Sequence, residues 1–291
     1  MRTLDPDEPL PQELLADFAE RTGQAPDVRA PGAREVERLL LEEGGRAVAA
    51  LVYRRPREPR DPALILFFHA LTEEAGRRLL EKALPTLMRS ADRIITTIPL
   101  AHPAWDLTQW GFDRLERLTM ERDLASFSAP PPLLPDGYLA AALVPAHVPD
   151  LVLPARSANA GTIDNQLMPA SREDVEQMLA AFASGEVAGV PVDRSGSLTM
   201  LFVGTPVGVI LAQRPSRQTG FLKDIFVAPE HQGQGLGRAL IVLALHAFKA
   251  DGAARVEVET GPSLAAYHLL RRLGFKALAE RPLYFWLRDT E

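Results

Sequence analysis

The chain has 291 residues, 46% of them hydrophobic and 24% charged, and a formal net charge of −6. This length favours about two domains, and the composition is sufficient for packed cores. The acidic balance disfavours a general nucleic-acid binder, which needs a basic face. The absence of cysteine excludes disulfides and catalysis through a cysteine thiolate.

The N-terminus, MRTLDPDEPLPQE, is acidic and lacks the apolar segment of a signal peptide. No apolar run in the sequence has the length of a membrane span. We therefore expect a soluble cytoplasmic protein with neither a membrane nor a nucleic acid as partner.

The first half of the chain alternates helical and strand-like patterns. Apolar spacing predicts helices over residues 10–22, 33–43 and 72–87, and strands over residues 46–54, 63–70, 93–98 and 117–122. In the second helix Val36, Leu39 and Leu40 form the apolar side. Thr72 caps the third helix, with Glu73 and Glu74 in its first turn. Three consecutive prolines then predict a semi-rigid linker over Ser128–Pro135.

The second half begins with a strand over residues 138–144 and a polar helix over residues 147–164, broken near Pro154. Ser171 and Asp174 predict the start of another helix. Further apolar runs predict strands over residues 197–203, 207–212, 221–227, 255–260 and 283–287, and helices up to residue 250 and over residues 264–273.

The stretch from Phe221 to Leu240, FLKDIFVAPEHQGQGLGRAL, combines a strand, a glycine-rich turn and the start of a helix. Such a turn lets successive backbone N–H groups approach one anion, and the helix N-terminus adds partial positive charge. The Walker ending and the dinucleotide fingerprint are both absent: position 238, where the third glycine of the fingerprint is expected, is Arg.

Gln232, Gly235 and Gly237 form the pattern Q-x-x-G-x-G, which resembles the acetyl-CoA motif of the GCN5-related N-acetyltransferase (GNAT) superfamily. The preceding V-x-P-E at residues 227–230 and the later Gly274-Phe275 also resemble that family, in the same order. An ordinary glycine turn before a helix leaves this ordering unexplained.

A weak internal repeat links the two halves. Gly76-Arg77-x-Leu79 matches Gly237-Arg238-x-Leu240, Arg93-Ile94 matches Arg255-Val256, and Gly111-Phe112 matches Gly274-Phe275, at nearly constant offset. We predict an α/β fold, α+β by some classifications, of two tandem GNAT-like units, each a mixed, mostly antiparallel sheet flanked by helices. The predicted boundaries are 1–127, a linker over 128–136, and 137–291. Coincidence among short patterns is the alternative explanation of the repeat.

The resemblance implies how the second unit holds acetyl-CoA. It places the pantetheine arm along Ile225, Phe226 and Val227, in a gap between two splayed strands. It assigns the diphosphate to the backbone N–H groups of Gln232, Gly233, Gln234, Gly235, Leu236, Gly237 and Arg238, and it puts Ser263 where relatives carry a cofactor-binding asparagine. In the first half, Thr72 and Glu74 stand where the glycines are expected, so we predict that residues 1–127 bind no CoA.

The implied reaction is direct attack of an amine on the thioester, which needs a base, a carbonyl donor and a proton for the thiolate. We expect a backbone N–H near Val227 to be the donor. Asp224 or Glu259 is the candidate base. Glu257 shares the strand face of Glu259, and the alternative is that these glutamates face solvent or pair with Arg255.

The candidate acid departs from the family pattern. Leu270 stands where many relatives carry a tyrosine, and Tyr267, one turn earlier, is the possible substitute. No spacing of His, Asp and Glu indicates a metal site.

We therefore predict an acetyl-CoA-dependent N-acetyltransferase that acts on a small primary amine. One alternative is a tandem acetyltransferase of an aminosugar-thiol, resembling mycothiol synthase. Another is a CoA-binding regulator or scaffold without turnover.

Overall fold

The computed structural model describes residues 1–5, 8–22, 36–56, 61–96, 106–187 and 189–288. The chain forms two compact units, residues 1–116 with 281–291 and residues 117–280. Within the described residues, no helix is long and apolar enough to cross a membrane.

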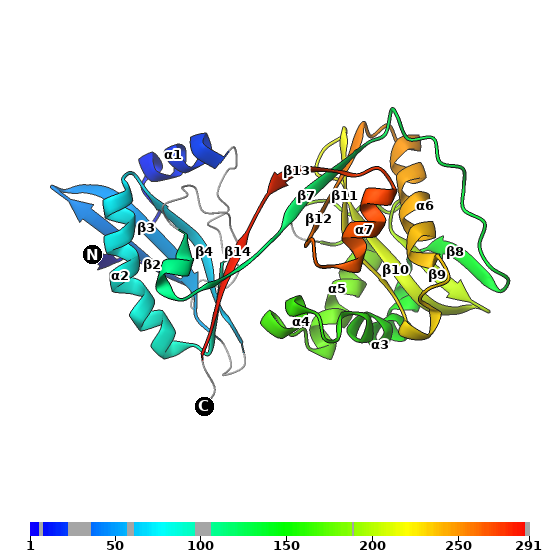
Figure 1. The fold of residues 1–291 in the computed structure, drawn as a ribbon, viewed down its shortest axis with the longest axis horizontal. Coiled ribbons are helices and arrows are strands. Elements are labelled where there is room, and N and C mark those ends of the chain that lie inside the picture. Colours follow the sequence, from blue (N-terminus) through cyan, green and yellow to red (C-terminus); the bar gives the residue numbers. More distant parts are fainter. Residues whose placement is uncertain (6–7, 23–35, 57–60, 97–105, 188, 289–291) are drawn as a thin grey trace. The chain divides into compact units, whose positions relative to one another are not determined.

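The first unit is a seven-stranded sheet in the order β1-β2-β3-β4-β5-β14-β6 (Figure 1). Its strands are β1 (Arg2–Thr3), β2 (Val36–Glu43), β3 (Arg46–Arg54), β4 (Ala63–Ala70), β5 (Arg93–Thr96), β6 (Asp113–Leu115) and β14 (Leu283–Leu287). Helix α2 (Glu73–Ser90) packs on one face of the sheet and α1 (Gln12–Thr22) on the other, and the 3-10 turn η3 (Leu107–Trp110) leads into β6.

The second unit repeats this plan with the order β8-β9-β10-β11-β12-β7-β13. Its strands are β7 (Leu118–Asp123), β8 (Tyr138–Ala142), β9 (Leu198–Phe202), β10 (Thr205–Gln213), β11 (Thr219–Val227), β12 (Arg255–Thr260) and β13 (Lys276–Glu280). Its helices are α3 (Val148–Asn159), α4 (Ile163–Leu167), α5 (Arg172–Ser184), α6 (Leu236–Ala250) and α7 (Ala265–Arg272), with 3-10 turns η4 (Pro145–His147) and η5 (Pro229–His231).

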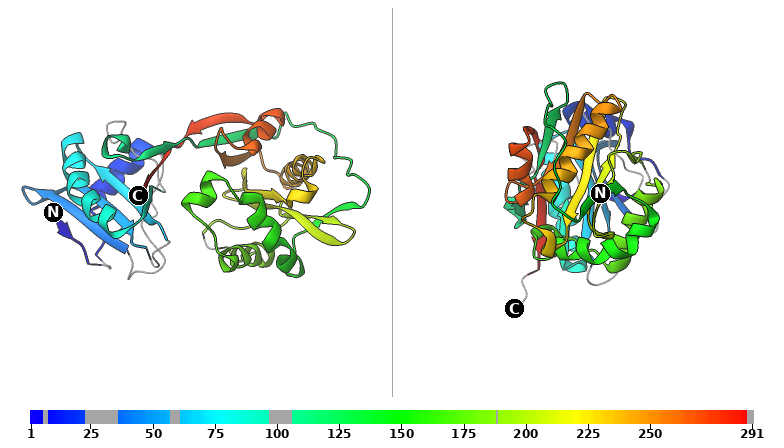
Figure 2. Two further views of the ribbon diagram at one scale, coloured as in Figure 1. Left: turned by 60° about the horizontal axis from the view of Figure 1, so that its bottom comes forward. Right: turned by 90° about the vertical axis from the view of Figure 1, so that its right-hand side faces the viewer.

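The sheet of the second unit separates two cores. Helices α6 and α7 pack on one face around Leu240, Leu245 and Leu270, and α3 and α5 pack on the other around Leu151 and Leu179. Figure 2 shows these two layers with the sheet between them. Strands β10 and β11 therefore contribute side chains to both cores.

The internal repeat extends to the details of the sheets. In each unit the described strand pairs are antiparallel except for one central parallel pair, β4 with β5 and β11 with β12. The register of β4 slips at Leu66, and that of β11 slips at Lys223, so a β-bulge occupies the same place in both units. The predicted fold class, two mixed and mostly antiparallel sheets flanked by helices, is confirmed.

The unit boundaries differ from those predicted by the sequence. Strand β7, expected to close the first half, lies between β12 and β13 in the sheet of the second unit. Strand β14, expected to close the second half, lies between β5 and β6 in the first unit. The Pro-rich segment 128–136 consequently joins β7 to β8 inside the second unit and is not an interdomain linker. Composition cannot reveal this exchange, because either strand satisfies the same pattern.

Two helix predictions are also wrong. The described part of the helix expected over 33–43 is strand β2, and residues 33–35 lie outside the described residues. Leu39 and Leu41 enter one core and Leu40 the other, so a leucine run that suits a helix is here a strand buried on both faces. The helix expected to break near Pro154 continues to Asn159, and the chain turns at Gly161 with φ 79°. For the strand expected over 93–98, residues 97 and 98 lie outside the described residues.

The position of β7 in the second sheet predicts which fragment of the chain can fold by itself. A fragment of residues 117–280 keeps all seven strands of the second sheet, whereas residues 137–291 lack β7, the strand that pairs with both β12 and β13. We expect a cooperative thermal transition by circular dichroism for 117–280 and none for 137–291. Equal cooperativity of the two fragments would contradict the strand assignment.

Val203 carries a backbone strain that can be relieved. It has φ 48° in the turn between β9 and β10, is 77% exposed, and its N–H donates to the Gly137 carbonyl. A β-branched residue is unfavourable in this left-handed region by about 1–2 kcal/mol, whereas asparagine adopts it readily. We expect Val203→Asn to raise the free energy of unfolding by about 1 kcal/mol in urea titrations, and Val203→Ala to raise it less.

Candidate functional site

The two central strands of the second unit separate part of the way along. Parallel pairing joins Thr219–Leu222 of β11 to Arg255–Val258 of β12 and stops there. Beyond that point β12 pairs only with β7, and β11 pairs only with β10 among the described strands. One edge of β11, from Lys223 to Val227, is therefore left open.

The backbone of Ile225 and Val227 faces this opening. The Ala228 N–H donates to the Val207 carbonyl at 2.8 Å, toward β10, so alternate residues of β11 turn their polar groups the other way. The Ile225 N–H accordingly donates to Oδ1 of Asp224 at 2.8 Å rather than to β10. The Val227 carbonyl accepts a bond from Nε2 of Gln232 at 2.8 Å.

Phe226 points elsewhere. Its side chain is 3% exposed and packs with Val209 and Leu211 in the core beside α3 and α5. Ile225 and Val227 direct their side chains to the opposite core, beside α6. The opening thus exposes main-chain groups of this stretch, and the ring of Phe226 holds the strand in place.

The opening leads into the glycine-rich turn at residues 232–238. Gly233 and Gly235 have φ 75° and 80°, a conformation that non-glycine residues rarely adopt. Helix α6 follows with neither an acidic residue in its first turn nor a side-chain cap at its N-terminus. In the described part of the chain, the N–H groups from Gly233 to Arg238 have no hydrogen-bond acceptor, and the helical ladder begins at Ala239. Such a row of free donors is an anion cradle.

Gln232 differs from its expected role. Its N–H donates to the Pro229 carbonyl at 3.2 Å, within η5, and is not free for an anion. Its side chain bonds Val227 instead, which ties the cradle to the end of β11. The spacing of the motif did not reveal this contact, because it depends on the turn made by η5.

The first unit lacks the cradle at the equivalent place. Residues 71–72 join β4 to α2, whereas residues 228–235 join β11 to α6. The N-terminus of α2 is closed by Thr72, whose Oγ1 accepts a bond from the Ala75 N–H at 3.2 Å, and Glu73 and Glu74 follow. Two carboxylates and a filled cap disfavour a bound anion.

Two candidate carboxylates lie on one face of the second sheet. The bulge at Lys223 turns Asp224 to the face of Phe226, beside α3 and α5. Val256 and Val258 face α6, so Glu257 and Glu259 also point to the side of α3 and α5. Glu257 accepts a bond from Nε of Arg255 at 3.1 Å, whereas Glu259 is exposed.

The surroundings of Asp224 favour its neutral form. Burial raises the pKa of this carboxyl group, while the bond from the Ile225 N–H and the charge of Lys223 lower it. The raised pKa brings the carboxyl closer to the range of a general base.

Arg117 is a largely buried cation near the candidate base Glu259, and the sequence did not indicate it. It lies at the start of β7, its side chain is 14% exposed, and its guanidinium forms an ion pair with Asp164 of α4. Burial lowers its pKa and the nearby charge of Glu259 raises it. Its contribution to this sheet follows from the strand exchange, which sequence order assigns to the wrong unit.

Helix α7 carries the candidate acid. Leu270 is 2% exposed in the core with α6, and Tyr267 is partly buried against the same core. The Tyr267 ring contacts His268, with centroids 5.3 Å apart, and Arg271 lies over it at 5.8 Å. Ser263 is exposed just before the helix. Among the described residues, no hydrogen bond joins Tyr267 to Asp224 or Glu259.

An aromatic contact borders the cradle. His231 of η5 and Tyr138 of β8 are joined at 2.7 Å through Nδ1 and the hydroxyl, and Phe202 packs against both rings. These rings hold η5 against the strands.

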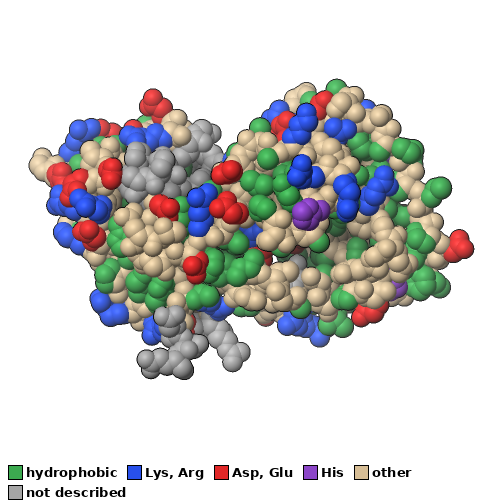
Figure 3. All heavy atoms as spheres, in the orientation of Figure 1, with side chains coloured by type: hydrophobic (Ala, Val, Ile, Leu, Met, Phe, Trp, Pro, Cys, Tyr) green, Lys and Arg blue, Asp and Glu red, His purple; other side chains and the backbone are tan. Residues whose placement is uncertain are grey.

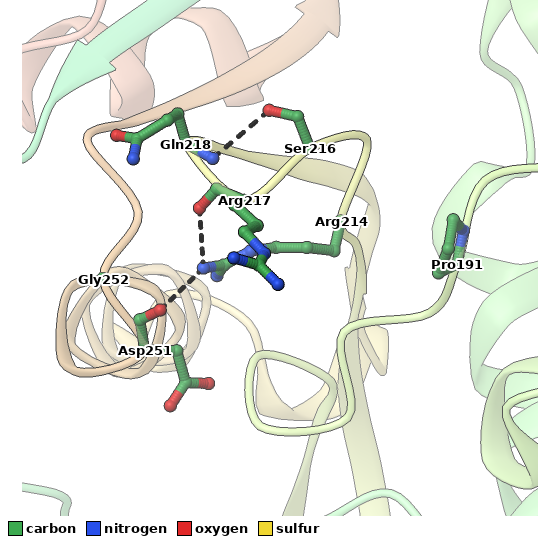
Figure 4. Close-up of a pocket in the computed structure, with 7 residues that line it drawn as sticks. All are labelled: Pro191, Arg214, Ser216, Arg217, Gln218, Asp251 and Gly252. Atoms are coloured by element: carbon green, nitrogen blue, oxygen red, sulfur yellow. Dashed lines mark hydrogen bonds between the residues drawn. The ribbon is translucent and has the colours of Figure 1, made fainter.

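The hollow in Figure 4 lies at the other end of α6. Its volume is about 530 Å³, and it is lined by Pro191, Arg214, Ser216, Arg217, Gln218, Asp251 and Gly252. Arg214 donates to the carbonyls of Arg217 and Asp251 at 3.0 and 2.8 Å. These bonds tie the end of α6 to the turn before β11, a structural role.

Comparisons with known proteins agree with this geometry. Residues 165–275 match the model of the acetyltransferase (GNAT) family. No curated protein sequence matches the chain. A GCN5-related N-acetyltransferase from Sphaerobacter thermophilus has a similar structure, with TM-score 0.68 and 17% identity over 96% of this chain and 92% of that one.

Two further structures are similar. A tandem GNAT protein from the clavulanic acid biosynthesis pathway has TM-score 0.65 and 15% identity, over 99% of this chain and 98% of that one. The glucosamine N-acetyltransferase region of a fungal multi-domain GH3 beta-N-acetylglucosaminidase has TM-score 0.62 and 12% identity, over 96% of this chain and 35% of that one. The fold of the chain is thus similar to that of these GNAT proteins, and the stretch that matches the acetyltransferase family lies within the second unit.

Proposed function

We propose that this protein is an acetyl-CoA-dependent N-acetyltransferase that acts on a small primary amine by direct transfer. The observation that carries the proposal is the end of parallel pairing at Leu222 and Val258. It leaves an open strand edge that runs directly into a cradle of free backbone donors. One continuous main-chain surface can therefore hold an extended molecule that ends in a diphosphate.

The residues present fit acetyl-CoA, which supplies an activated acyl group as a thioester. The backbone of Ile225 and Val227 bonds the pantetheine amides, as an added strand bonds a sheet edge. The N–H groups of Gly233, Gln234, Gly235, Leu236, Gly237 and Arg238 bind the diphosphate. Ser263, exposed before α7, is the remaining candidate contact to the cofactor.

Asp224 and Glu259 are the proposed base, acting on the ammonium group of the acceptor. Both lie on the face beside α3 and α5, and burial raises the pKa of Asp224, which makes it a stronger base than an ordinary aspartate. The Val227 N–H, which faces the opening, is the proposed carbonyl donor. Tyr267 is the proposed proton source for the departing thiolate.

Two other functions have support. The tandem plan suits an acetyltransferase of an aminosugar-thiol, similar to mycothiol synthase, and one similar structure is a glucosamine N-acetyltransferase region. A CoA-binding scaffold without turnover is favoured by Leu270, which lies in the core at the place of the usual tyrosine. In either case the first unit, with its closed α2 N-terminus, binds no CoA.

The proposed function predicts thiol release. Purified full-length protein with acetyl-CoA and a panel of primary amines, glucosamine included, should release CoA thiol with at least one amine, and the product should be N-acetylated by mass spectrometry. Tight binding of one CoA per chain without release on any amine would favour the scaffold. Binding of two CoA molecules per chain would contradict a silent first unit.

Two glycines with the same backbone conformation, one inside the cradle and one outside it, allow a matched test of CoA binding. Gly235 and Gly204 have φ 80° and 85°, and a Cβ at either position meets no atom within 4 Å. Alanine at either site should destabilise the fold by about 1 kcal/mol through the left-handed backbone. Only Gly235→Ala should also weaken CoA binding in calorimetry, because Gly235 lies within the cradle and Gly204 lies in the turn between β9 and β10. An equal loss of affinity in Gly204→Ala would contradict the assignment.

The base assignment predicts a pH dependence. The ionised form of Asp224 is the active base, so kcat/KM should rise with pH through an apparent pKa above the usual aspartate value of about 3.9. Asp224→Asn should remove this limb and lower the rate by about a hundredfold. Glu259→Gln tests the other candidate base in the same way. Its control is Glu257→Gln, which removes only the bond to Arg255. If Asp224→Asn and Glu259→Gln both leave rate and profile unchanged, the assignment fails.

A further inference from the structure

Helix α7 presents a basic hollow beside the cradle. His268, Arg271 and Arg272 line this hollow of about 360 Å³. A neighbouring residue of the helix, Leu269, approaches to 3.9 Å from the place where a Cβ on Gly237 would stand. Helix α7, which carries the hollow, therefore lies beside the first turn of α6. Figure 3 shows Lys and Arg side chains and a histidine gathered over α7 and α6.

These cations lack counter-ions. His268, Arg271 and Arg272 are exposed, and in the described part of the chain none of them forms an ion pair. Arg238, in the first turn of α6, is likewise exposed and unpaired there. By contrast, Arg46, Arg77 and Arg78 of the first unit each pair with a glutamate. An unpaired cationic cluster attracts an anion more strongly than paired arginines do.

The three basic residues of α7 lie on one face of the helix. Residues 268, 271 and 272 stand three and four positions apart, so their side chains are neighbours on α7. Arg271 is held over the Tyr267 ring at 5.8 Å, which limits its freedom before any ligand binds. Two guanidinium groups and an imidazole suit a phosphate monoester, with its two negative charges and several acceptor oxygens.

We propose that His268, Arg271 and Arg272 form a second anion site that binds the 3′-phosphate of CoA while the cradle binds its diphosphate. The inference rests on the proposed function, because it requires CoA at the cradle. The 3′-phosphate is attached to the same ribose as the diphosphate, a few covalent bonds away. A site for it must therefore lie near the start of α6, beside which α7 and its basic hollow are found. Through this site the protein distinguishes CoA from dephospho-CoA, which lacks that phosphate.

Calorimetric titration of the full chain with CoA and with dephospho-CoA tests the proposal without an acceptor. We expect CoA to bind on the order of tenfold more tightly or better, since bonds between charged groups carry the difference. The double variant R271Q/R272Q should bind CoA only as tightly as dephospho-CoA and should leave dephospho-CoA binding unchanged. The preference should shrink in high salt. Arg217→Gln, an exposed arginine at the other end of α6, is the matched control.

The outcomes separate this proposal from the proposed function. Equal affinity of the unaltered protein for the two nucleotides would overturn the 3′-phosphate site and leave the cradle intact. A preference for CoA that persists in R271Q/R272Q would also overturn it, because other residues would then carry the preference. Absence of binding of both nucleotides would overturn the cradle, and the second site with it.

Discussion

The structure depends on one interrupted interaction, the parallel pairing of β11 and β12. These strands share hydrogen bonds only as far as Leu222 and Val258. Continued pairing would bury the edge of β11 in an ordinary sheet, and the cradle would then follow a closed strand. Because the pairing stops, the edge of β11 at Ile225 and Val227 stays open toward β12, where the Ile225 N–H is bonded by Asp224 and the Val227 carbonyl by Gln232. The bulge at Lys223 turns Asp224 toward the face beside α3 and α5.

The exchange of β7 and β14 means that the sheet of each unit contains a strand that sequence order would assign to the other unit. The strand beyond β12 comes from the N-terminal part of the sequence, and it brings Arg117 close to Glu259 and Asp164. The first unit receives its own inner strand, β14, from the end of the chain. Each sheet is thus completed by an exchanged strand, and only in the first unit is the equivalent helix N-terminus, that of α2, closed by Thr72.

In the second unit the residues suited to binding an anion are more complete than those suited to proton transfer. Its anion cradle has free donors, glycines in the required conformation and no nearby acid on α6. Its proton chemistry is less complete, because Leu270 lies in the core and Tyr267 is engaged by His268 and Arg271. The same helix carries the exposed basic side chains that we propose to bind the 3′-phosphate of CoA.

The sequence by itself determined the local features: the strand-turn-helix of the cradle, the capping of α5 by Ser171, the tandem repeat and the loss of glycines in the first unit. These depend on φ preferences, caps and short-range periodicity, which neighbouring residues set. Only the tertiary structure decided that Val36–Glu43 is a strand, that β7 and β14 change places, and that Arg117 belongs with Glu259. The physical reason is that strand pairing joins residues far apart in the chain, and a strand carries no mark of which sheet edge it will complete.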